Sequence, residues 1–127
     1  MGVTREKVEN FEDLRVWQRG IELTKQIYLT TSQGEISKDF GLKNQLRRAA
    51  VSVPTNIAEG FERRSRKEYV NFLNIAKGSA GEIRSLLRVA IEVSYLEEKT
   101  YLQLYGQAKE LSRMLANQIK AINQSLE

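Results

Sequence analysis

Basic side chains in the middle of the sequence point to chemistry with phosphate groups. Residues 41–90 contain ten basic and four acidic side chains, a net charge of +6, whereas residues 1–40 and 91–127 each have a net charge of −1. A surface that gathers such charges attracts phosphates and releases their counterions, which is the main source of non-specific affinity for nucleic acid. No aromatic residue lies between Arg63 and Lys67 or between Lys77 and Arg88 in the sequence, so we expect little base stacking and weak sequence specificity. The residues predicted to bind nucleic acid are Arg47, Arg48, Arg63, Arg64, Arg66, Lys67, Lys77, Arg84 and Arg88.

Two arrangements of these charges are compatible with the sequence. Lys77, Arg84 and Arg88 share one edge of a predicted helix, at spacings of seven and four residues. With the other basic residues they would form a continuous band along one side of the molecule. The alternative is a solvated face on which Glu62 or Glu68 pairs with nearby arginines, so that the charge serves only solubility.

Residue types that serve in catalysis and metal binding are scarce. The sequence has no His and no Cys, which removes the commonest general base, the Ser–His and Cys–His nucleophile pairs, cysteine-ligated zinc and disulfides. A di-iron carboxylate bundle requires Glu-x-x-His motifs and is excluded for the same reason. Glu59 and Glu82 lie beside apolar stripes, but hydrogen bonding across a helix interface explains two such carboxylates better than a metal or a shared proton does. We therefore predict a non-enzymatic protein without a cofactor or metal.

Length and hydropathy bound the location and the number of domains. A chain of 127 residues fits one domain. No run of about 18 apolar residues exists to cross a membrane, and the first residues lack the apolar core of a secretory signal. Together with the missing cysteines, these features predict a cytoplasmic protein that does not bind a membrane.

Four amphipathic segments are expected to position the basic residues. Apolar residues recur at helical spacing in each segment, Gly34 separates the first two, and Ser65 with Glu68 forms a capping box before the third. Short connections between helices favour antiparallel neighbours. The prediction is therefore an all-α, up-down four-helix bundle that fills residues 1–127 as one domain. Its predicted parts are an N-terminal segment at 1–12 and helices at about 13–31, 38–60, 66–96 and 98–126.

The pattern of each helix predicts its buried face. In the first helix Leu14, Trp17, Ile21 and Tyr28 fall on one face, which Leu23 and Ile27 widen. In the second helix Pro54 predicts a bend, because proline lacks the backbone donor that an α-helix uses. The mid-helix glycines Gly78 and Gly81 predict a close approach of another helix.

Some apolar residues lie outside the main stripes of the second and third helices. Either these residues contact a second neighbour within the bundle, or they form a subunit interface. A chain that self-associates would use these additional apolar residues of both helices. The residues predicted for the subunit interface are Val51, Pro54, Ala58, Ile75, Leu86, Val89 and Val93.

Three stretches of sequence carry a resemblance to a known family. The first is Phe11-Glu12-Asp13-Leu14 followed by Val16-Trp17-Gln18, and the longest is the block Gly-Leu-Lys-Asn-Gln-Leu-Arg-Arg-Ala-Ala-Val-Ser-Val-Pro-Thr-Asn-Ile-Ala-Glu-Gly at 41–60. The third runs from Ser65 through residues 72–79 to Glu82. Together they resemble the four-helix-bundle proteins encoded in intervening sequences of bacterial large-subunit ribosomal RNA genes.

The resemblance implies an assembly and partners that the residue pattern does not supply. Members of this family are expected to form a homopentamer with a barrel-like, basic surface. The resemblance also implies kinship with the accessory variability determinant of diversity-generating retroelements, a protein of similar fold that binds nucleic acid and contacts a reverse transcriptase. The implied partners are thus further copies of this chain, RNA or DNA, and a reverse transcriptase.

The predicted function is that of a non-enzymatic, oligomeric accessory protein that binds nucleic acid through its basic surface. The alternative is a protein–protein adaptor or scaffold with no intrinsic affinity for nucleic acid. In the alternative, the spare apolar patches dock a partner protein. The two hypotheses differ in whether the purified chain binds nucleic acid in a salt-dependent manner.

Overall fold

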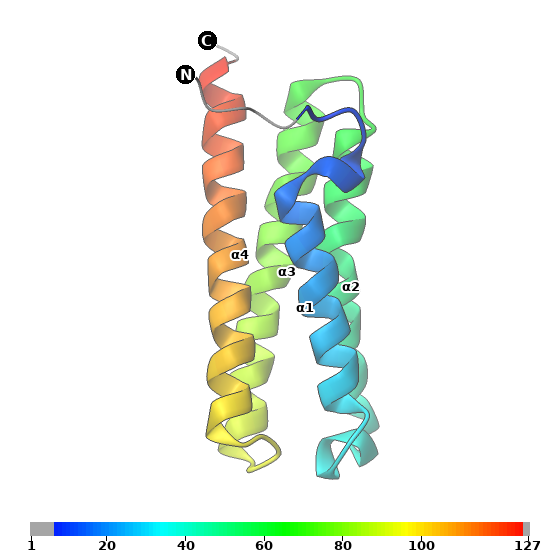
Figure 1. The fold of residues 1–127 in the computed structure, drawn as a ribbon, viewed down its shortest axis with the longest axis vertical. Coiled ribbons are helices and arrows are strands. Elements are labelled where there is room, and N and C mark those ends of the chain that lie inside the picture. Colours follow the sequence, from blue (N-terminus) through cyan, green and yellow to red (C-terminus); the bar gives the residue numbers. More distant parts are fainter. Residues whose placement is uncertain (1–6, 126–127) are drawn as a thin grey trace.

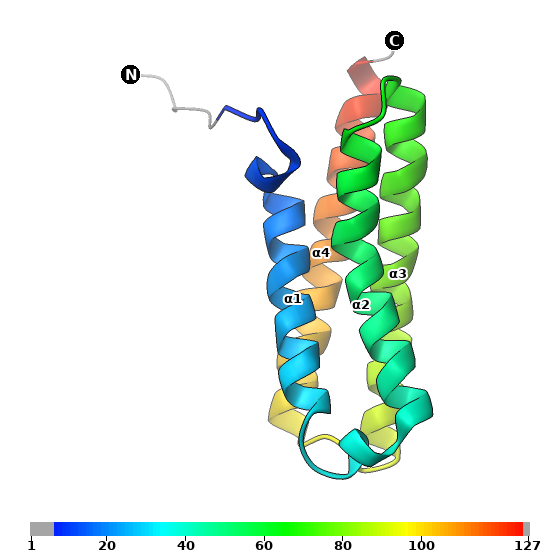
Figure 2. The same ribbon diagram turned by 90° about the vertical axis from the view of Figure 1, so that its right-hand side faces the viewer.

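Four long helices make up the structure, a computed structural model that describes residues 7–125. In Figures 1 and 2 the helices lie side by side along one long axis, and the colours show that each helix runs in the opposite direction to the one before it. No strand occurs within residues 7–125, which confirms the prediction of an all-α chain with four long helices. The helices are α1 at Arg15–Thr31, α2 at Phe40–Phe61, α3 at Arg66–Glu92 and α4 at Glu98–Ser125.

Short 3-10 helices precede α1 and α2, namely η1 at Phe11–Asp13 and η2 at Glu35–Lys38. Residues 1–6 of the predicted N-terminal segment and residue 126, the predicted end of the fourth helix, lie outside the described residues. None of the helices in the described range combines the length and the apolar character that a membrane-spanning segment needs.

The predicted helix ends are close to the observed ones, except at the end of α3. We expected this helix to reach residue 96, but it ends at Glu92. Ser94 adopts a positive φ of 64°, which is incompatible with a continuing α-helix. The N–H of Tyr95 then donates to the carbonyl of Ala90 at 2.9 Å and closes the turn. Ser94 therefore belongs to the α3–α4 turn.

Local hydrogen bonds fix the beginnings of α1 and α3. The Asp13 carboxylate accepts from the backbone N–H groups of Glu9 and Asn10, each at 3.0 Å, just before α1 begins. The Ser65 hydroxyl oxygen accepts from the N–H of Glu68 at 3.0 Å, as the sequence predicts for an N-cap. The carboxylate of Glu68 reaches the Ser65 hydroxyl at 3.4 Å, so it reinforces the same cap.

The predicted buried face of α1 is confirmed for Leu14, Leu23 and Ile27 but is wrong for Ile21 and Tyr28. Val16, Leu23 and Ile27 enter the core, together with Gly20. Ile21 and Tyr28, which we predicted to be buried, are 42% and 40% exposed. The spacing of large apolar side chains was misleading because α1 approaches α2 at Gly20. A glycine has no side chain and therefore adds nothing to a hydrophobic pattern.

Contacts between α1 and α2 explain how a proline is accommodated within α2. The helix is continuous through Pro54, and the bend expected there stays a prediction. Pro54 lacks the N–H that would donate to the carbonyl of Ala50. The Thr24 hydroxyl of α1 lies 3.0 Å from that carbonyl oxygen and can donate to it, while also lying 2.7 Å from the carbonyl oxygen of Gly20. The ring of Pro54 packs against Gly20, where an added Cβ would lie 3.4 Å from Pro54 Cδ.

α2 approaches α3 closely at Gly60. A Cβ on this residue would lie 2.7 Å from Phe72 Cβ and 3.2 Å from the carbonyl oxygen of Tyr69. The predicted close approach at Gly78 and Gly81 is wrong for the single chain. No atom comes within 4 Å of a Cβ on Gly78, and only the guanidinium of Arg84 does so at Gly81.

Candidate nucleic-acid interface

The turn between α2 and α3 gathers four basic side chains at one end of the bundle. α2 ends at Phe61 and α3 begins at Arg66, so the turn is short. The C-terminal end of α4 and the segment before α1 lie at the same end (Figure 1). All four side chains are exposed, and we call them the turn cluster: Arg63, Arg64, Arg66 and Lys67.

Two members of the turn cluster are held by other residues and two are not. Arg63 pairs with Glu59 at 2.5 Å. Arg66 donates to the carbonyl oxygen of Ser125 at 3.1 Å and to its hydroxyl at 3.0 Å, which ties the start of α3 to the end of α4. Arg64 and Lys67 form no ion pair or side-chain hydrogen bond with the described residues. Their charges are therefore available to an external anion.

Arg47 occupies a different position from the predicted one. Its guanidinium lies at the C-terminal end of α1, where Nε donates to the Thr31 hydroxyl at 2.9 Å and a terminal nitrogen donates to the Ser32 hydroxyl at 3.0 Å. The same terminal nitrogen lies 3.3 Å from the carbonyl oxygen of Tyr28. A cation at the C-terminal end of a helix is favoured by the helix dipole. Arg47 thus fastens α2 to α1, whereas the adjacent Arg48 is exposed.

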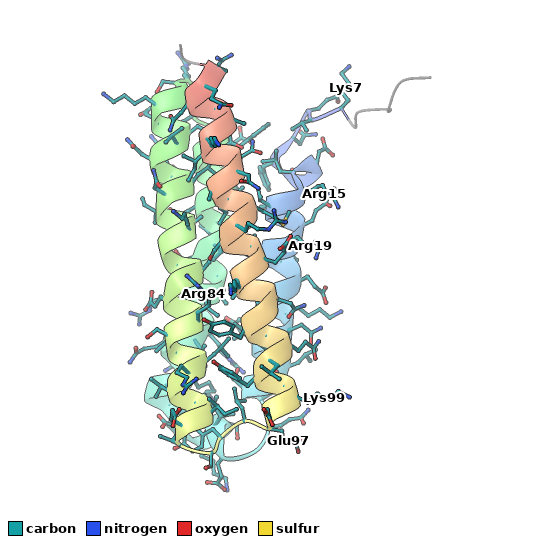
Figure 3. The ribbon with its side chains drawn as sticks, turned by 90° about the vertical axis from the view of Figure 1, so that its left-hand side faces the viewer. Lys7, Arg15, Arg19, Arg84, Glu97 and Lys99 are labelled. Carbon is teal, nitrogen blue, oxygen red and sulfur yellow. The ribbon has the colours of Figure 1, made fainter. Side chains whose placement is uncertain are left out.

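The three predicted residues of α3 share one edge of that helix, because they are seven and four residues apart. Lys77 and Arg88 are exposed, and Arg84 is half-buried. Figure 3 shows Arg84 at the seam between α3 and α4. Arg88 pairs with Glu92 at 2.8 Å. The hydroxyl of Tyr101 on α4, followed by Glu92, raises the pKa of Arg88 above its ordinary value because both stabilise the charged guanidinium.

Arg47 does not join a continuous band with the other predicted basic residues, because its guanidinium turns toward α1. The turn cluster lies at one end of the bundle, and Arg84 lies at the seam between α3 and α4 (Figure 3). Successive residues of an α-helix point about 100° apart, so neighbours in sequence diverge around the axis. Local ion pairs, as in the alternative prediction, do occur at Arg63–Glu59 and Arg88–Glu92, although no pair of Glu62 or Glu68 is found among the described residues.

Aromatic rings lie against two of the arginines, which the sequence did not reveal. The guanidinium of Arg47 is 4.4 Å from the ring centroid of Tyr28, and that of Arg63 is 4.9 Å from the ring centroid of Phe72. These distances are within the range of cation–π attraction. Each ring therefore holds a guanidinium in place on the protein surface.

An apolar groove lies between α1 and α2, beside η1. Its volume is about 510 Å³, and both Glu59 and Glu62 contribute to its lining. The sequence patch that we assigned to a subunit interface lines this groove, but Pro54 is buried against α1 and is not available to a second chain, which corrects its assignment. The apolar lining residues are Phe11, Trp17, Ile21, Val51, Pro54 and Ala58.

The outer face of α3 leaves further apolar side chains uncovered in the single chain. Ile75 is 51% exposed, Val89 46% and Val93 51%, whereas Leu86 is half-buried. α1 contributes further exposed apolar residues. Among them are Ile21 and Tyr28, which we had predicted to be buried. Gly20 is the sequence feature that would have indicated the true buried face of α1, since it marks where the helix can approach a neighbour closely.

The carboxylates do not assemble into a metal site within residues 7–125, where no group of three acidic side chains has suitable proximity. Glu59 is occupied by its ion pair with Arg63, and Glu82 is exposed. This ion pair joins Glu59, near the end of α2, to Arg63 in the turn that follows. We had expected Glu59 to accept hydrogen bonds across a helix interface.

Comparisons with known proteins agree with the fold. The sequence profile of the family described as 23S rRNA-intervening sequence protein matches residues 12–117. A crystal structure from Bacteroides thetaiotaomicron, of a protein with unknown function from the S23 ribosomal protein family, is similar with a TM-score of 0.76. It is 27% identical in sequence, and the match covers 83% of this chain and 98% of that chain. No protein of curated function matches this chain.

Proposed function

The chain belongs to the 23S rRNA-intervening sequence protein family, and on this premise we propose that it is a non-enzymatic, oligomeric accessory protein that binds nucleic acid through phosphate contacts. The observation that carries the proposal is the turn cluster, in which Arg64 and Lys67 are exposed and engage no described residue. Exposed cations of this kind bind phosphates without reading bases. The absence of His and Cys from the sequence supports a role without catalysis.

The turn cluster sits on a rigid part of the chain, which favours binding. Gly60 brings the end of α2 against α3, and Ser65 caps α3 directly beside the basic residues. Arg66 links this end of α3 to the end of α4. Because the backbone is already ordered, little conformational entropy is lost when a phosphate binds.

The assembly that we propose is the homopentamer implied by the family resemblance. Uncovered apolar side chains on α1 and α3 support self-association, since Ile21, Ile75 and Val93 each leave more than two-fifths of their surface exposed in a single chain. A closed ring repeats the turn cluster in every subunit and raises the affinity for a long strand by multivalency. Light scattering over a range of concentrations should give the mass of five chains, and a monomer at every concentration would refute the assembly.

Salt-dependent binding tests the proposed function. Gel-shift or filter-binding measurements with single-stranded and duplex RNA and DNA of unrelated sequences should show affinity that falls steeply as salt rises. The double variant Arg64→Glu/Lys67→Glu should bind all of these nucleic acids more weakly. Its salt slope should be smaller by about 1.5–2, because two phosphate contacts are lost.

A matched control separates the turn cluster from the total charge. Lys25→Glu/Lys109→Glu makes the same change in net charge at exposed positions of α1 and α4. This control should bind nearly as well as the wild-type chain. Equal losses in the two variants would refute a specific role of the turn cluster, and no binding at about 50 mM salt would refute nucleic-acid binding altogether.

The apolar groove between α1 and α2 favours the second candidate function, a protein–protein adaptor. Trp17 and Val51 line a concave surface whose other lining includes the carboxylate of Glu62. Such a groove suits an amphipathic helix of a partner protein. A reverse transcriptase is the partner to test first, because of the kinship implied by the sequence resemblance. Capture of that enzyme after nuclease treatment, by a chain that binds no nucleic acid itself, would replace the first proposal by the second.

A further inference from the structure

Arg84 has an unusual environment for an arginine. It lies in the interior of α3, its side chain is half-buried, and its guanidinium lies at the seam with α4 (Figure 3). Its Nε is buried and has no hydrogen-bond acceptor among the described residues. No carboxylate within residues 7–125 forms an ion pair with it. A guanidinium remains charged at any physiological pH, so this side chain is a partly desolvated cation without a counter-ion.

Such a position costs folding free energy unless something else compensates for it. Buried polar atoms in folded proteins almost always have a partner, and an exception calls for an explanation. Removing a cation from water is unfavourable when no opposite charge faces it. Arg47 and Arg63 show how the chain treats arginines that serve its own fold, because both have acceptors and an aromatic ring. Arg84 makes no such contact with the described residues.

The neighbours of Arg84 extend the positive charge along the same edge of α3. Lys77 lies about 10 Å away along the helix axis and Arg88 about 6 Å away, from their spacings of seven and four residues. Gly81 falls on this edge between Lys77 and Arg84, and an added Cβ there would meet only the guanidinium of Arg84, at 3.7 Å. A glycine leaves the backbone bare beside the guanidinium, so a ligand can approach it closely.

We propose that Arg84, with Lys77 and Arg88, forms a phosphate-binding subsite on the α4 side of α3. The planar guanidinium presents several N–H donors in a fork that matches phosphate oxygens. A phosphate bound there would accept from the terminal nitrogens of the guanidinium and act as the counter-ion, whereas the buried Nε lies out of its reach. The subsite deepens the proposed function and rests on it for the source of the phosphate, the backbone of a single strand that follows the edge of α3.

The test compares Arg84→Met with the wild-type full-length chain. Methionine keeps an unbranched apolar stem in the seam and removes the charge. We expect the variant to bind a short single strand of uniform base composition about tenfold more weakly at fixed salt. The salt slope should fall by about one. Arg113→Met removes an exposed, ion-paired arginine of α4 and should bind as the wild-type chain does.

Unfolding measurements distinguish binding from a packing role. Because Arg84→Met removes a desolvated cation without a counter-ion, its unfolding midpoint should equal or exceed that of the wild-type chain. A lower midpoint together with unchanged affinity would assign Arg84 a structural role and overturn the subsite. Unchanged affinity at an unchanged midpoint would also overturn it.

Inorganic phosphate separates the subsite from the proposed function. If Arg64→Glu/Lys67→Glu weakens nucleic-acid binding and Arg84→Met does not, the proposed function stands and the subsite fails. If the chain binds no nucleic acid, but inorganic phosphate raises its unfolding midpoint only when Arg84 is present, the subsite stands as a site for free phosphate. The proposed function then fails.

Discussion

Replacing Gly60 by Ala tests whether the contact between α2 and α3 leaves room for a single methyl group. The added Cβ would lie 2.7 Å from Phe72 Cβ, whereas ordinary contact begins at 3.4 Å, so the two atoms must separate by 3.4 − 2.7 = 0.7 Å. The obstructing atom is attached directly to the α3 backbone, and no side-chain rotation can move it away. The carbonyl oxygen of Tyr69, at 3.2 Å, limits movement in a second direction.

The expected magnitude follows from two opposing effects. Overpacking of a well-packed contact costs about 1–3 kcal/mol. Ala is favoured over Gly within a helix by about 0.5–1 kcal/mol. Gly60→Ala should therefore lower the free energy of unfolding by about 1–2 kcal/mol. Gly106→Ala is the matched control, because this glycine lies within α4 and nothing comes within 4 Å of an added Cβ.

Urea unfolding followed by helical circular dichroism measures both variants. The protein concentration must be held constant, because self-association would stabilise the folded chain by mass action. Gly106→Ala should be more stable than the wild-type chain by about 0.5–1 kcal/mol. Both variants gain the preference of Ala over Gly in a helix. The difference between their free energies of unfolding therefore isolates the steric cost at Gly60. Equal stabilities of Gly60→Ala and Gly106→Ala would refute the inferred close contact.

Two further predictions concern hydrogen bonds at the ends and seams of the helices. Thr24→Val should lower the free energy of unfolding by about 1–3 kcal/mol, because the carbonyl of Ala50 opposite Pro54 loses its donor. Thr24→Ser keeps the hydroxyl, and an equal loss in the two variants by urea unfolding would contradict this account. The pKa of Asp13 is lowered from 3.8 by the backbone N–H groups of Asn10 and Glu9, so its contribution to stability is present above that pH and is lost as the pH falls through the folded-state pKa. Asp13→Asn should therefore flatten the acid limb of a plot of unfolding midpoint against pH, and an unchanged limb would show that these hydrogen bonds do not stabilise the fold.

The positions of the helices were predictable because their determinants are local. Apolar spacing, the Ser65 cap and the glycine at 34, whose φ is +69°, all act within a few residues of one another. The end of α3 was misjudged for a local reason as well. Apolar residues continue beyond Glu92, but the positive φ of Ser94 ends the helix, and serine gives little indication of that conformation.

The buried face of α1 and the proposed subunit interface required the contacts between helices. Hydrophobic periodicity counts side-chain size, whereas α1 meets α2 at Gly20, where the absence of a side chain admits the ring of Pro54. Consequently Ile21 faces outward and lines the groove with Val51. Pro54 packs against Gly20 and is buried, so it is no longer assigned to the predicted subunit interface.

The sequence by itself determined the helical class, the family and the excess of positive charge between residues 41 and 90. Only the tertiary structure decided which of those basic side chains are held by hydrogen bonds or ion pairs within the protein. Arg47 binds the end of α1, whereas Arg64 forms no ion pair or side-chain hydrogen bond with a described residue. Arg84 enters the seam with α4, where its Nε has no acceptor among the described residues. The reason is physical: helix periodicity depends on neighbours in the chain, whereas the partner of a long charged side chain is set by the rotation and separation of whole helices.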